Sequence, residues 1–494
     1  MAIMATGMVM ELKIKKLFIL FCSIFTLPSL SGEWQFAPSI STEETYTDNI
    51  ERVVVEPTAS FVNQLMAGLN AEYQSNLAAL SFSGSKSYMF YSHDSEINDD
   101  FRSLSTTGSY SVWRNGPTLV ASASIANISG NNASNSLADL VSGDTIERRS
   151  QSGGVEYNFG NTSYSVKSSV IYSRIRYEDG LSDSEGFTAI FNSQNGNNAR
   201  SVYWQLDSRF TKRTQGASDG ENYTVNALIG AMTSFNLNPF VRFYDEQLSG
   251  TIANNNRQTT PSWGPGVRWL TSPHLIIDLS YNFVADETIS EDYVAANFDW
   301  SPSARTSLSA GYSKRFFGDS YDFSFNHRNR RLTNNISYNE SLESFDRNNF
   351  QAEDDGLELI ESNEFSLNKR LSWQSTLQLS RTSFGIIIST NERTGLEKDV
   401  VDNYLNAGLT ITRTISPKSS LSLSTTFRFN EFDKDNPEGS RQTDYYRTNM
   451  MTYSKNLALS LFTSFALQHV NRDSTIDKYS YDEMRAVINI TKDF

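Results

Sequence analysis

The stretch SLSLSTTFRFNEF, residues 420–432, decides the fold class of this chain. Its positions alternate between two kinds of side chain. One set is mostly apolar and consists of Leu421, Leu423, Thr425, Phe427 and Phe429, whereas the other is polar and consists of Ser420, Ser422, Ser424, Thr426, Arg428 and Asn430. Successive side chains of a β-strand point to opposite faces, so this period of two predicts a strand with one apolar face and one polar face.

The same alternation recurs along the chain, for example in SVYWQLDSRF (201–210) and HLIIDLSYNF (274–283). Short linkers with turn residues occur at 114–117, 159–163, 236–239, 301–304, 367–370 and 416–419. Longer polar linkers occur at 92–100, 211–222, 346–362, 391–403 and 430–442. Outer-membrane barrels combine tight periplasmic turns with longer extracellular loops. We therefore expect an all-β fold, a large antiparallel transmembrane β-barrel of about 18–24 strands.

Residues 1–31 are predicted to be a signal peptide. A basic segment with Lys13, Lys15 and Lys16 precedes the apolar run 17–27, and Met10 would serve equally well as the start. The only cysteine is in this segment, so a chain cleaved here contains no disulfide. Alternation already begins at Trp34, so residues 32–494 are expected to form a single barrel domain.

Composition and charge exclude several classes of protein. Aromatic residues make up 12% of the chain although only 38% is hydrophobic, which favours strands. The net charge of −14 becomes −16 when the three lysines and one glutamate of the signal peptide are removed, so no nucleic-acid partner is expected. No other apolar stretch is long enough for a membrane-spanning helix.

The last twelve residues, EMRAVINITKDF, are predicted to form the strand that closes the barrel. Ile488, Ile490 and Phe494 share one face, and we interpret them as an insertion signal for the barrel assembly machinery. Lys492 interrupts this apolar series, and we expect it to extend toward the lipid headgroups.

The N-terminal segment WQFAPSISTEETYTDNIE (34–51) resembles a known family. The residues that carry the resemblance are Trp34, Pro38, Tyr46, Thr47, Asp48 and Asn49. They resemble the signature of the PEP-CTERM/exosortase system-associated outer-membrane proteins, within the β-barrel porin class. The resemblance implies a Gram-negative outer-membrane barrel linked to exopolysaccharide production, and it implies no catalytic residues. The segment after Pro57 departs from the expected pattern, since Thr58-Ala59-Ser60 lacks a glycine and a second proline.

No enzymatic chemistry is expected, because no catalytic, cofactor-binding or metal-binding set stands out. The four histidines, His93, His274, His327 and His469, are far apart in sequence. Acidic clusters in the longer linkers could bridge divalent cations to lipopolysaccharide or be merely solvated. They comprise Asp94, Glu96, Asp99 and Asp100, then Glu353, Asp354 and Asp355, then Asp433, Asp435 and Glu438.

The polar strand faces are expected to line the lumen, with Lys167, Arg209 and Arg428 as candidate lumen residues. Loops 128–150 and 346–362 are candidates to constrict it. We therefore predict a porin-like channel or conduit in the cell outer membrane of a Gram-negative bacterium, associated with exopolysaccharide production or export. Its expected partners are outer-membrane lipid, lipopolysaccharide and the barrel assembly machinery.

Two alternatives remain at this point. One is a structural or adhesive outer-membrane barrel whose extracellular loops bind surface polysaccharide or lipopolysaccharide without transport. The other is a soluble secreted β-protein, since alternation alone also fits a sandwich.

Overall fold

The computed structural model describes the chain from residue 32 onward, apart from several short segments. The described residues are 32–131, 134–143, 145–178, 182–196, 198–253, 258–285, 291–344, 349–353, 356–360, 364–397, 400–432 and 442–494. The predicted signal peptide lies outside them, as do the acidic residues Asp354, Asp355, Asp433, Asp435 and Glu438. Signal cleavage and cation binding at those acidic residues therefore stay predictions.

The described residues form 27 β-strands and three short 3-10 helices. The strands are β1 (Glu33–Thr47), β2 (Ser60–Gln74), β3 (Ala78–Tyr91), β4 (Asp99–Ser111), β5 (Thr118–Ser129), β6 (Thr145–Gly160), β7 (Tyr164–Tyr177), β8 (Ser184–Asn195), β9 (Val202–Gln215), β10 (Ser218–Ala231), β11 (Leu237–Ser249), β12 (Gln258–Thr259), β13 (Ser262–Ser272), β14 (Leu275–Val284), β15 (Tyr293–Ser303), β16 (Thr306–Arg315), β17 (Gly318–Arg328), β18 (Leu332–Ser344), β19 (Asn349–Glu353), β20 (Gly356–Ile360), β21 (Phe365–Gln378), β22 (Thr382–Gly395), β23 (Val401–Ser416), β24 (Ser419–Phe432), β25 (Gln442–Ala458), β26 (Leu461–Ser474) and β27 (Tyr481–Asp493). The helices are η1 (Ser95–Ile97), η2 (Thr251–Ala253) and η3 (Asp477–Tyr479), and no helix in the described residues is long and apolar enough to cross a membrane.

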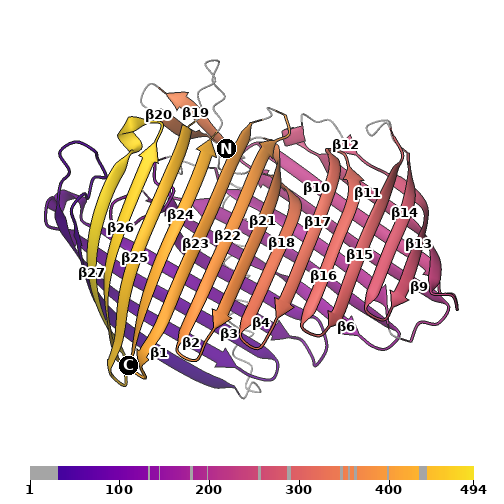
Figure 1. The fold of residues 1–494 in the computed structure, drawn as a ribbon, viewed down its shortest axis with the longest axis horizontal. Coiled ribbons are helices and arrows are strands. Elements are labelled where there is room, and N and C mark those ends of the chain that lie inside the picture. The colour runs from indigo at the N-terminus through magenta and orange to yellow at the C-terminus, as the bar shows by residue number, and fades with distance from the viewer. Residues whose placement is uncertain are drawn as a thin grey trace, which may run out of the picture.

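The strands form a closed ring of 24 antiparallel strands (Figure 1). Each strand pairs with the next along the chain, and β1 pairs with β27 from Ser39 opposite Asp493 to Thr47 opposite Arg485. The two-residue β12 pairs only with the end of β11, and β19 pairs with β20 in a separate hairpin. The prediction of a large antiparallel barrel of 18–24 strands is confirmed, and closure removes the exposed edges that an open sheet would have.

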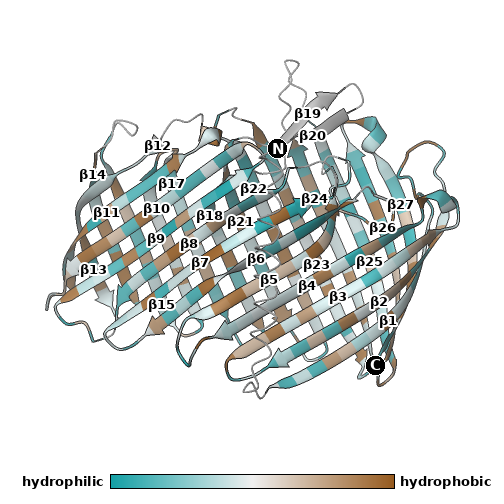
Figure 2. Cartoon of the chain, turned by 180° about the vertical axis from the view of Figure 1, so that it is seen from behind, coloured by the Kyte–Doolittle hydropathy of each residue, from teal (hydrophilic) through white to brown (hydrophobic). Residues whose placement is uncertain are grey.

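Apolar and polar residues alternate along the strands, as Figure 2 shows. Glu246 of β11 and Arg315 of β16 contact each other although β13, β14 and β15 separate their strands, so the polar face lines the lumen. The opposite face is outward, and it carries exposed apolar side chains such as Phe36, Val170 and Ile229. The predicted division between a polar inner wall and an apolar outer wall therefore holds in the fold.

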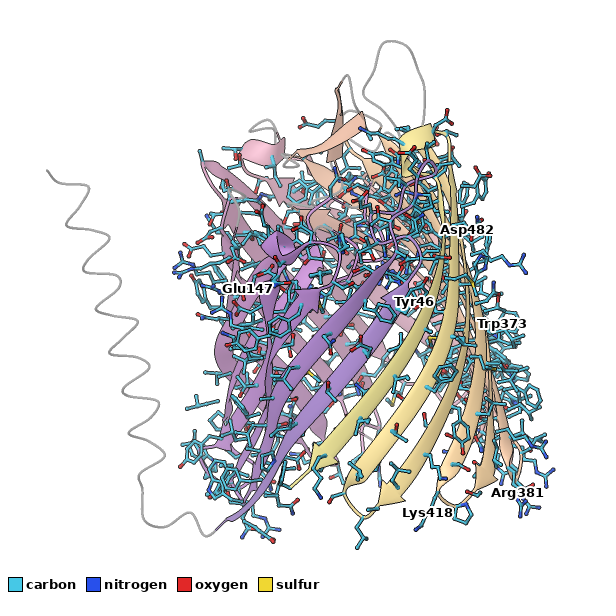
Figure 3. All side chains as sticks on the ribbon, turned by 90° about the vertical axis from the view of Figure 1, so that its left-hand side faces the viewer. Tyr46, Glu147, Trp373, Arg381, Lys418 and Asp482 are labelled. Carbon is cyan, nitrogen blue, oxygen red and sulfur yellow. The ribbon has the colours of Figure 1, made fainter. Side chains whose placement is uncertain are left out.

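The two ends of the barrel differ in the length of their connections. One end has short turns such as 75–77, 273–274, 417–418 and 459–460, and Figure 3 shows Arg381 and Lys418 in two of these turns. The opposite end has connections such as 48–59 and 130–144, and Asp482 lies toward that end (Figure 3). We call these the short-turn end and the long-loop end.

Three linker predictions were wrong. Residues 211–222 are the ends of β9 and β10, joined by a tight turn at Gly216, whose φ of 57° suits glycine. Residues 367–370 lie inside β21, and most of 391–403 lies in β22 and β23. The physical reason is common to all three: the strand ends toward the long-loop end carry the same polar residues as a loop, and here these residues pair across strands, as Lys369 does with Glu392 at 2.8 Å.

Candidate functional site

The connection between β5 and β6 turns into the barrel instead of projecting from its rim. We call its described residues 134–143 the lumen loop. Arg428 Nη1 of β24 donates a hydrogen bond to the carbonyl of Ser136 at 2.7 Å, and the Tyr91 hydroxyl of β3 donates to the carbonyl of Val141 at 3.2 Å. The loop therefore contacts a continuous sector of the inner wall that runs from β24 through β27 and β1 to β3. One of the two segments predicted to constrict the lumen thus lies inside the barrel, and its role as a constriction stays a prediction.

Four charged residues hold the lumen loop, and we call them the ionic anchor: Arg52, Asp139, Glu483 and Arg485. Asp139 of the loop lies 2.9 Å from Arg52 Nη2 and 2.7 Å from Arg485 Nη1. Arg485 also binds Glu483 at 2.5 Å, and Glu483 is completely buried. The two arginines come from the β1–β2 connection and from β27, so one carboxylate joins three separate segments of the chain.

The anchor is electrostatically matched. Burial by itself would raise the pKa of the Asp139 carboxyl, but the adjacent Arg485 and Arg52 outweigh burial and lower this pKa to about 2. Arg52 is held for this contact by a left-handed backbone with a φ of 56° and by the Tyr481 ring, 5.2 Å below its guanidinium. A buried, paired network of this kind is costly to break, because the partner left behind stays charged and desolvated.

Apolar contacts complete the seat of the lumen loop. Leu140 and Val141 pack against a buried cluster on the wall, formed by Ile50, Val62 and Met89. Leu137 packs against a second cluster, formed by Tyr446, Val470 and Tyr481. The loop is therefore a packed inner layer of the barrel, fixed by both charge and apolar burial.

The other half of the lumen is crossed by wall side chains instead of a loop. Arg315 of β16 binds Glu246 of β11 through two nitrogens, with Nε to Oε2 at 2.9 Å. The Tyr244 hydroxyl donates to the same Oε2 at 3.0 Å, and Arg242 Nη2 reaches Ser313 Oγ at 3.5 Å. We call these five residues the cross-lumen bridge. Nearby, a buried cluster of Leu248, Ile252, Ala253 and Phe365 joins the β11 side to β21.

A polar cavity of about 600 Å³ lies beside the cross-lumen bridge, between the β8–β11 wall and the β15–β18 wall. Its lumen-facing residues include Asn192, Asp207, Arg209, Asn226, Arg242, Asn297 and Asp322. Amides, hydroxyls and charges of both signs can form hydrogen bonds with a hydrated solute or a sugar. The cavity provides no nucleophile paired with a base in the described residues.

The three candidate lumen residues share the polar face but not one site. Arg209 lines the polar cavity, whereas Arg428 holds the lumen loop. Lys167 lies opposite Asn158 and Asn192, its neighbours in β6 and β8. The structure therefore divides these residues among three parts of the inner wall.

The segment that resembles a family signature lies at the seam where the barrel closes. Thr47 Oγ1 donates to Glu483 Oε1 at 2.6 Å, Asp48 accepts from the Met484 backbone N–H at 2.8 Å, and Asn49 Nδ2 donates to the Asp482 carbonyl at 3.0 Å. The last residue of β1 and the two residues after it thus bind three consecutive residues of β27. Trp34, Pro38 and Tyr46 lie on the outward face instead, where Trp34 contacts Tyr73 and Tyr46 contacts Phe61.

The predicted insertion signal also lies on the outward face. Ile488, Ile490 and Phe494 are exposed, and the Phe494 backbone N–H donates to the Pro38 carbonyl at 2.9 Å. The Lys492 ammonium lies 5.6 Å from the centre of the Phe494 ring and binds Ser460 Oγ in the adjacent turn. The role of this strand in assembly stays a prediction.

The first acidic cluster does not converge on a cation site. Asp94 caps η1 by accepting the Glu96 backbone N–H at 2.9 Å, and Asp100 pairs with Lys86 at 2.9 Å. Across the described residues, no three His, Cys, Asp or Glu side chains come together as a possible metal site.

No family model and no curated protein matches this chain. Among solved structures it is similar to the siderophore receptor PirA from Pseudomonas aeruginosa, with 10% identity, 93% of this chain and 80% of that chain covered, and a TM-score of 0.43. It is similar to the FrpB iron transporter from Neisseria meningitidis, with 10% identity, 92% and 81% covered, and a TM-score of 0.44. OmpT, an outer membrane protein of Vibrio cholerae, matches with 9% identity, 68% and 99% covered, and a TM-score of 0.28. Because these scores are below 0.5, the assignment as a barrel rests on the strand pairing of the chain itself.

Proposed function

We propose that the chain forms a porin-like channel or conduit across the outer membrane of a Gram-negative bacterium, and that the lumen loop constricts it. A closed ring of strands satisfies every backbone hydrogen bond between neighbours, which a sheet needs in order to span a bilayer. The apolar outer face suits lipid and the polar inner face suits water. The absence of an edge and this division of faces support a membrane location over a soluble sandwich.

The single observation that carries the channel proposal is the position of the lumen loop inside the barrel, against the inner wall. A loop folded inward and fixed on the wall by the ionic anchor narrows a lumen without interrupting its strands. Selectivity in such a pore comes from its diameter and from the charges that line it.

Exopolysaccharide is the cargo that we propose for this channel, on the resemblance of residues 34–51 to the PEP-CTERM/exosortase system-associated family. The polar cavity is compatible with this cargo, since its amides, hydroxyls and mixed charges are groups that bind sugars. Family membership and the link to exopolysaccharide stay predictions. Transport assays in liposomes with neutral and acidic oligosaccharides would test this part separately from the channel itself.

A planar-bilayer recording tests the channel. We expect measurable conductance from the refolded barrel and a larger conductance when residues 134–143 are replaced by a Gly-Ser linker. Arg52→Ala, which weakens the anchor without shortening the chain, should raise the conductance in the same direction. If neither the native barrel nor the loop-replaced barrel conducts, the channel proposal fails.

The cross-lumen bridge favours a second candidate, a structural or adhesive barrel. A lumen crossed on one side by wall residues and covered on the other by a loop could serve mainly as a rigid platform for the loops at the rim. In that case polysaccharide or lipopolysaccharide binding should survive substitutions at Arg209 and Arg242. The same binding should disappear when the rim loops are exchanged.

A further inference from the structure

The outward face carries a group of arginines that neither the lumen nor the barrel closure uses. We call Arg102 of β4, Arg149 of β6 and Arg176 of β7 the outer arginine cluster. Phe101 packs against the buried inner-wall cluster that also receives Val141 of the lumen loop, so its neighbour Arg102 faces away from the lumen. Arg102 and Arg149 both bind Glu147, which places their side chains on one side of the sheet.

The charges of this cluster are incompletely matched within the protein. Arg149 lies directly opposite Arg176 in the β6–β7 ladder, an arrangement in which like charges repel. The Glu147 carboxylate accepts from Arg102 Nε at 3.1 Å and from Arg149 Nε at 2.5 Å. Arg176 Nε lies 3.4 Å from Asp183 Oδ2. All three contacts use Nε. In the part of the chain that the structure describes, the terminal Nη groups of these three arginines have no hydrogen-bond acceptor.

The side chains remain accessible although their partner is buried. Arg102 and Arg149 are each 48% exposed and Arg176 is 52% exposed, whereas Glu147 is only 4% exposed beneath them. The guanidinium groups of Arg102 and Arg149 therefore lie over one shared carboxylate, and Arg176 lies beside Arg149 on the next strand. With the adjacent Arg174, four arginines face the three carboxylates Glu147, Asp183 and Glu185, in a chain whose overall charge is −14.

The depth of the cluster indicates what it contacts. Glu147 lies in the half of the barrel away from the short turns (Figure 3). Toward the short-turn end, the same outward faces of β6, β7 and β8 carry exposed apolar side chains, namely Val155, Val170, Tyr172, Phe187 and Phe191. The Tyr172 hydroxyl points away from this apolar band and donates to Glu185 at 2.7 Å, as an aromatic residue at a membrane interface does. The cluster thus lies where an apolar band ends on the long-loop side.

We propose that the outer arginine cluster binds the phosphate groups of a lipopolysaccharide molecule packed against β4–β7. The acyl chains would cover the apolar band, and the phosphates would reach the level of the arginines. Arginine forks suit phosphate because they donate parallel charge-assisted hydrogen bonds. A phosphate between Arg149 and Arg176 also removes the repulsion that the bare protein contains. This inference rests on the proposed outer-membrane location but not on the channel, so a barrel that conducts nothing would leave it intact.

The test uses the refolded full barrel in detergent, titrated with purified lipid A and followed by native mass spectrometry. The triple variant R102Q/R149Q/R176Q should bind lipid A about tenfold or more weakly than the native barrel, because it loses several charge-assisted hydrogen bonds. Arg447→Gln is the matched control, since Arg447 is an exposed outward arginine of β25 outside the cluster, and it should bind like the native protein. Equal binding by the triple variant and the native barrel would overturn the proposal.

Two further ligands separate a lipid site from a free-phosphate site. Dephosphorylated lipid A should bind the native barrel no better than it binds the triple variant. Inorganic phosphate at the same concentration should not compete with lipid A. If inorganic phosphate alone competes fully, or if dephosphorylated lipid A binds the native barrel as tightly as lipid A does, the assignment to lipopolysaccharide phosphate is wrong.

A single substitution guards against a triple variant that fails to fold. Arg176→Gln removes one of the two facing charges, so the lipid-free barrel should be at least as resistant to thermal unfolding as the native barrel. The rise in unfolding temperature on adding lipid A should shrink in this variant. An undiminished rise would contradict a role for Arg176.

Discussion

The lumen is narrowed in two different ways in its two halves, and the contrast separates what can move from what cannot. Between β24 and β3, a loop lies on the wall and is held by the ionic anchor. Between β11 and β16, the cross-lumen bridge joins two strands directly. The lumen loop can separate from the inner wall without the loss of any pairing between strands. The bridge can open only if the wall itself changes shape.

The cross-lumen bridge and the ionic anchor also differ in the segments of the chain that carry their charged residues. In the bridge, Glu246 and Arg315 both lie in strands that are fixed by neighbours on each side. In the anchor, Arg52 and Asp139 both lie in connections at the long-loop end, and only Glu483 and Arg485 lie in a strand. The same chemistry therefore stabilises the whole barrel in one half and a local conformation in the other.

The largest expected effect comes from breaking the bridge. Glu246→Gln leaves the Arg315 guanidinium in a buried position without its carboxylate, which should lower the free energy of unfolding of the barrel by about 3–5 kcal/mol. Urea unfolding in lipid vesicles, followed by tryptophan fluorescence, measures this loss. Ser313→Ala is the control, because it removes only the 3.5 Å contact with Arg242 and should change the stability little. If the Glu246 variant has the same free energy of unfolding as the native barrel, the bridge does not stabilise the wall.

A smaller and local effect is expected from breaking the anchor. Asp139→Asn keeps the shape of the side chain but removes the charge that pairs with both arginines, so seating of the lumen loop should weaken by about 1–3 kcal/mol. Hydrogen exchange of residues 134–143 should accelerate, while urea unfolding of the barrel changes little. Asp94→Asn, in another connection at the same end, is the matched control for loop exchange. If Asp139→Asn destabilises the whole barrel as strongly as Glu246→Gln does, the distinction between the two halves is wrong.

Much of the fold could be predicted from the sequence because alternation is a local property. The apolar series Leu421, Leu423 and Phe427 identifies a strand and its lipid-facing side from thirteen residues alone. The turn signals failed where polar residues at strand ends resemble loop residues, as at 211–222 and 367–370. A Gly-Ala pair at 216–217 and its flanking threonines and charges read as a loop until the pairing of β9 with β10 shows them to be strand ends.

The candidate site was much less predictable because its contacts join residues that are distant in sequence. Alternation placed Arg209 and Arg428 on the polar face, but it could not pair Asp139 with Arg485 across 346 residues or Glu246 with Arg315 across 69. The register of a closed ring and the path of a loop inside it decide those pairs. A sequence signal existed only for the seam, where Thr47, Asp48 and Asn49 already stood out as one element.

The smallest expected effect is that of pH on the lumen loop. The folded-state pKa of Asp139, about 2, is below the ordinary value of 3.8, so its contribution to loop seating is complete above that ordinary value and is lost as the pH falls toward 2. Hydrogen exchange of residues 134–143, corrected for intrinsic rates, should therefore stay constant from pH 7 to pH 4 and accelerate only in stronger acid. Asp139→Asn should give a loop that is loosened throughout this range and shows no such acid transition. Release of the native loop between pH 7 and pH 5 would show that a group other than Asp139 controls its seating, and Asp139 would then not be the residue that holds the loop in place.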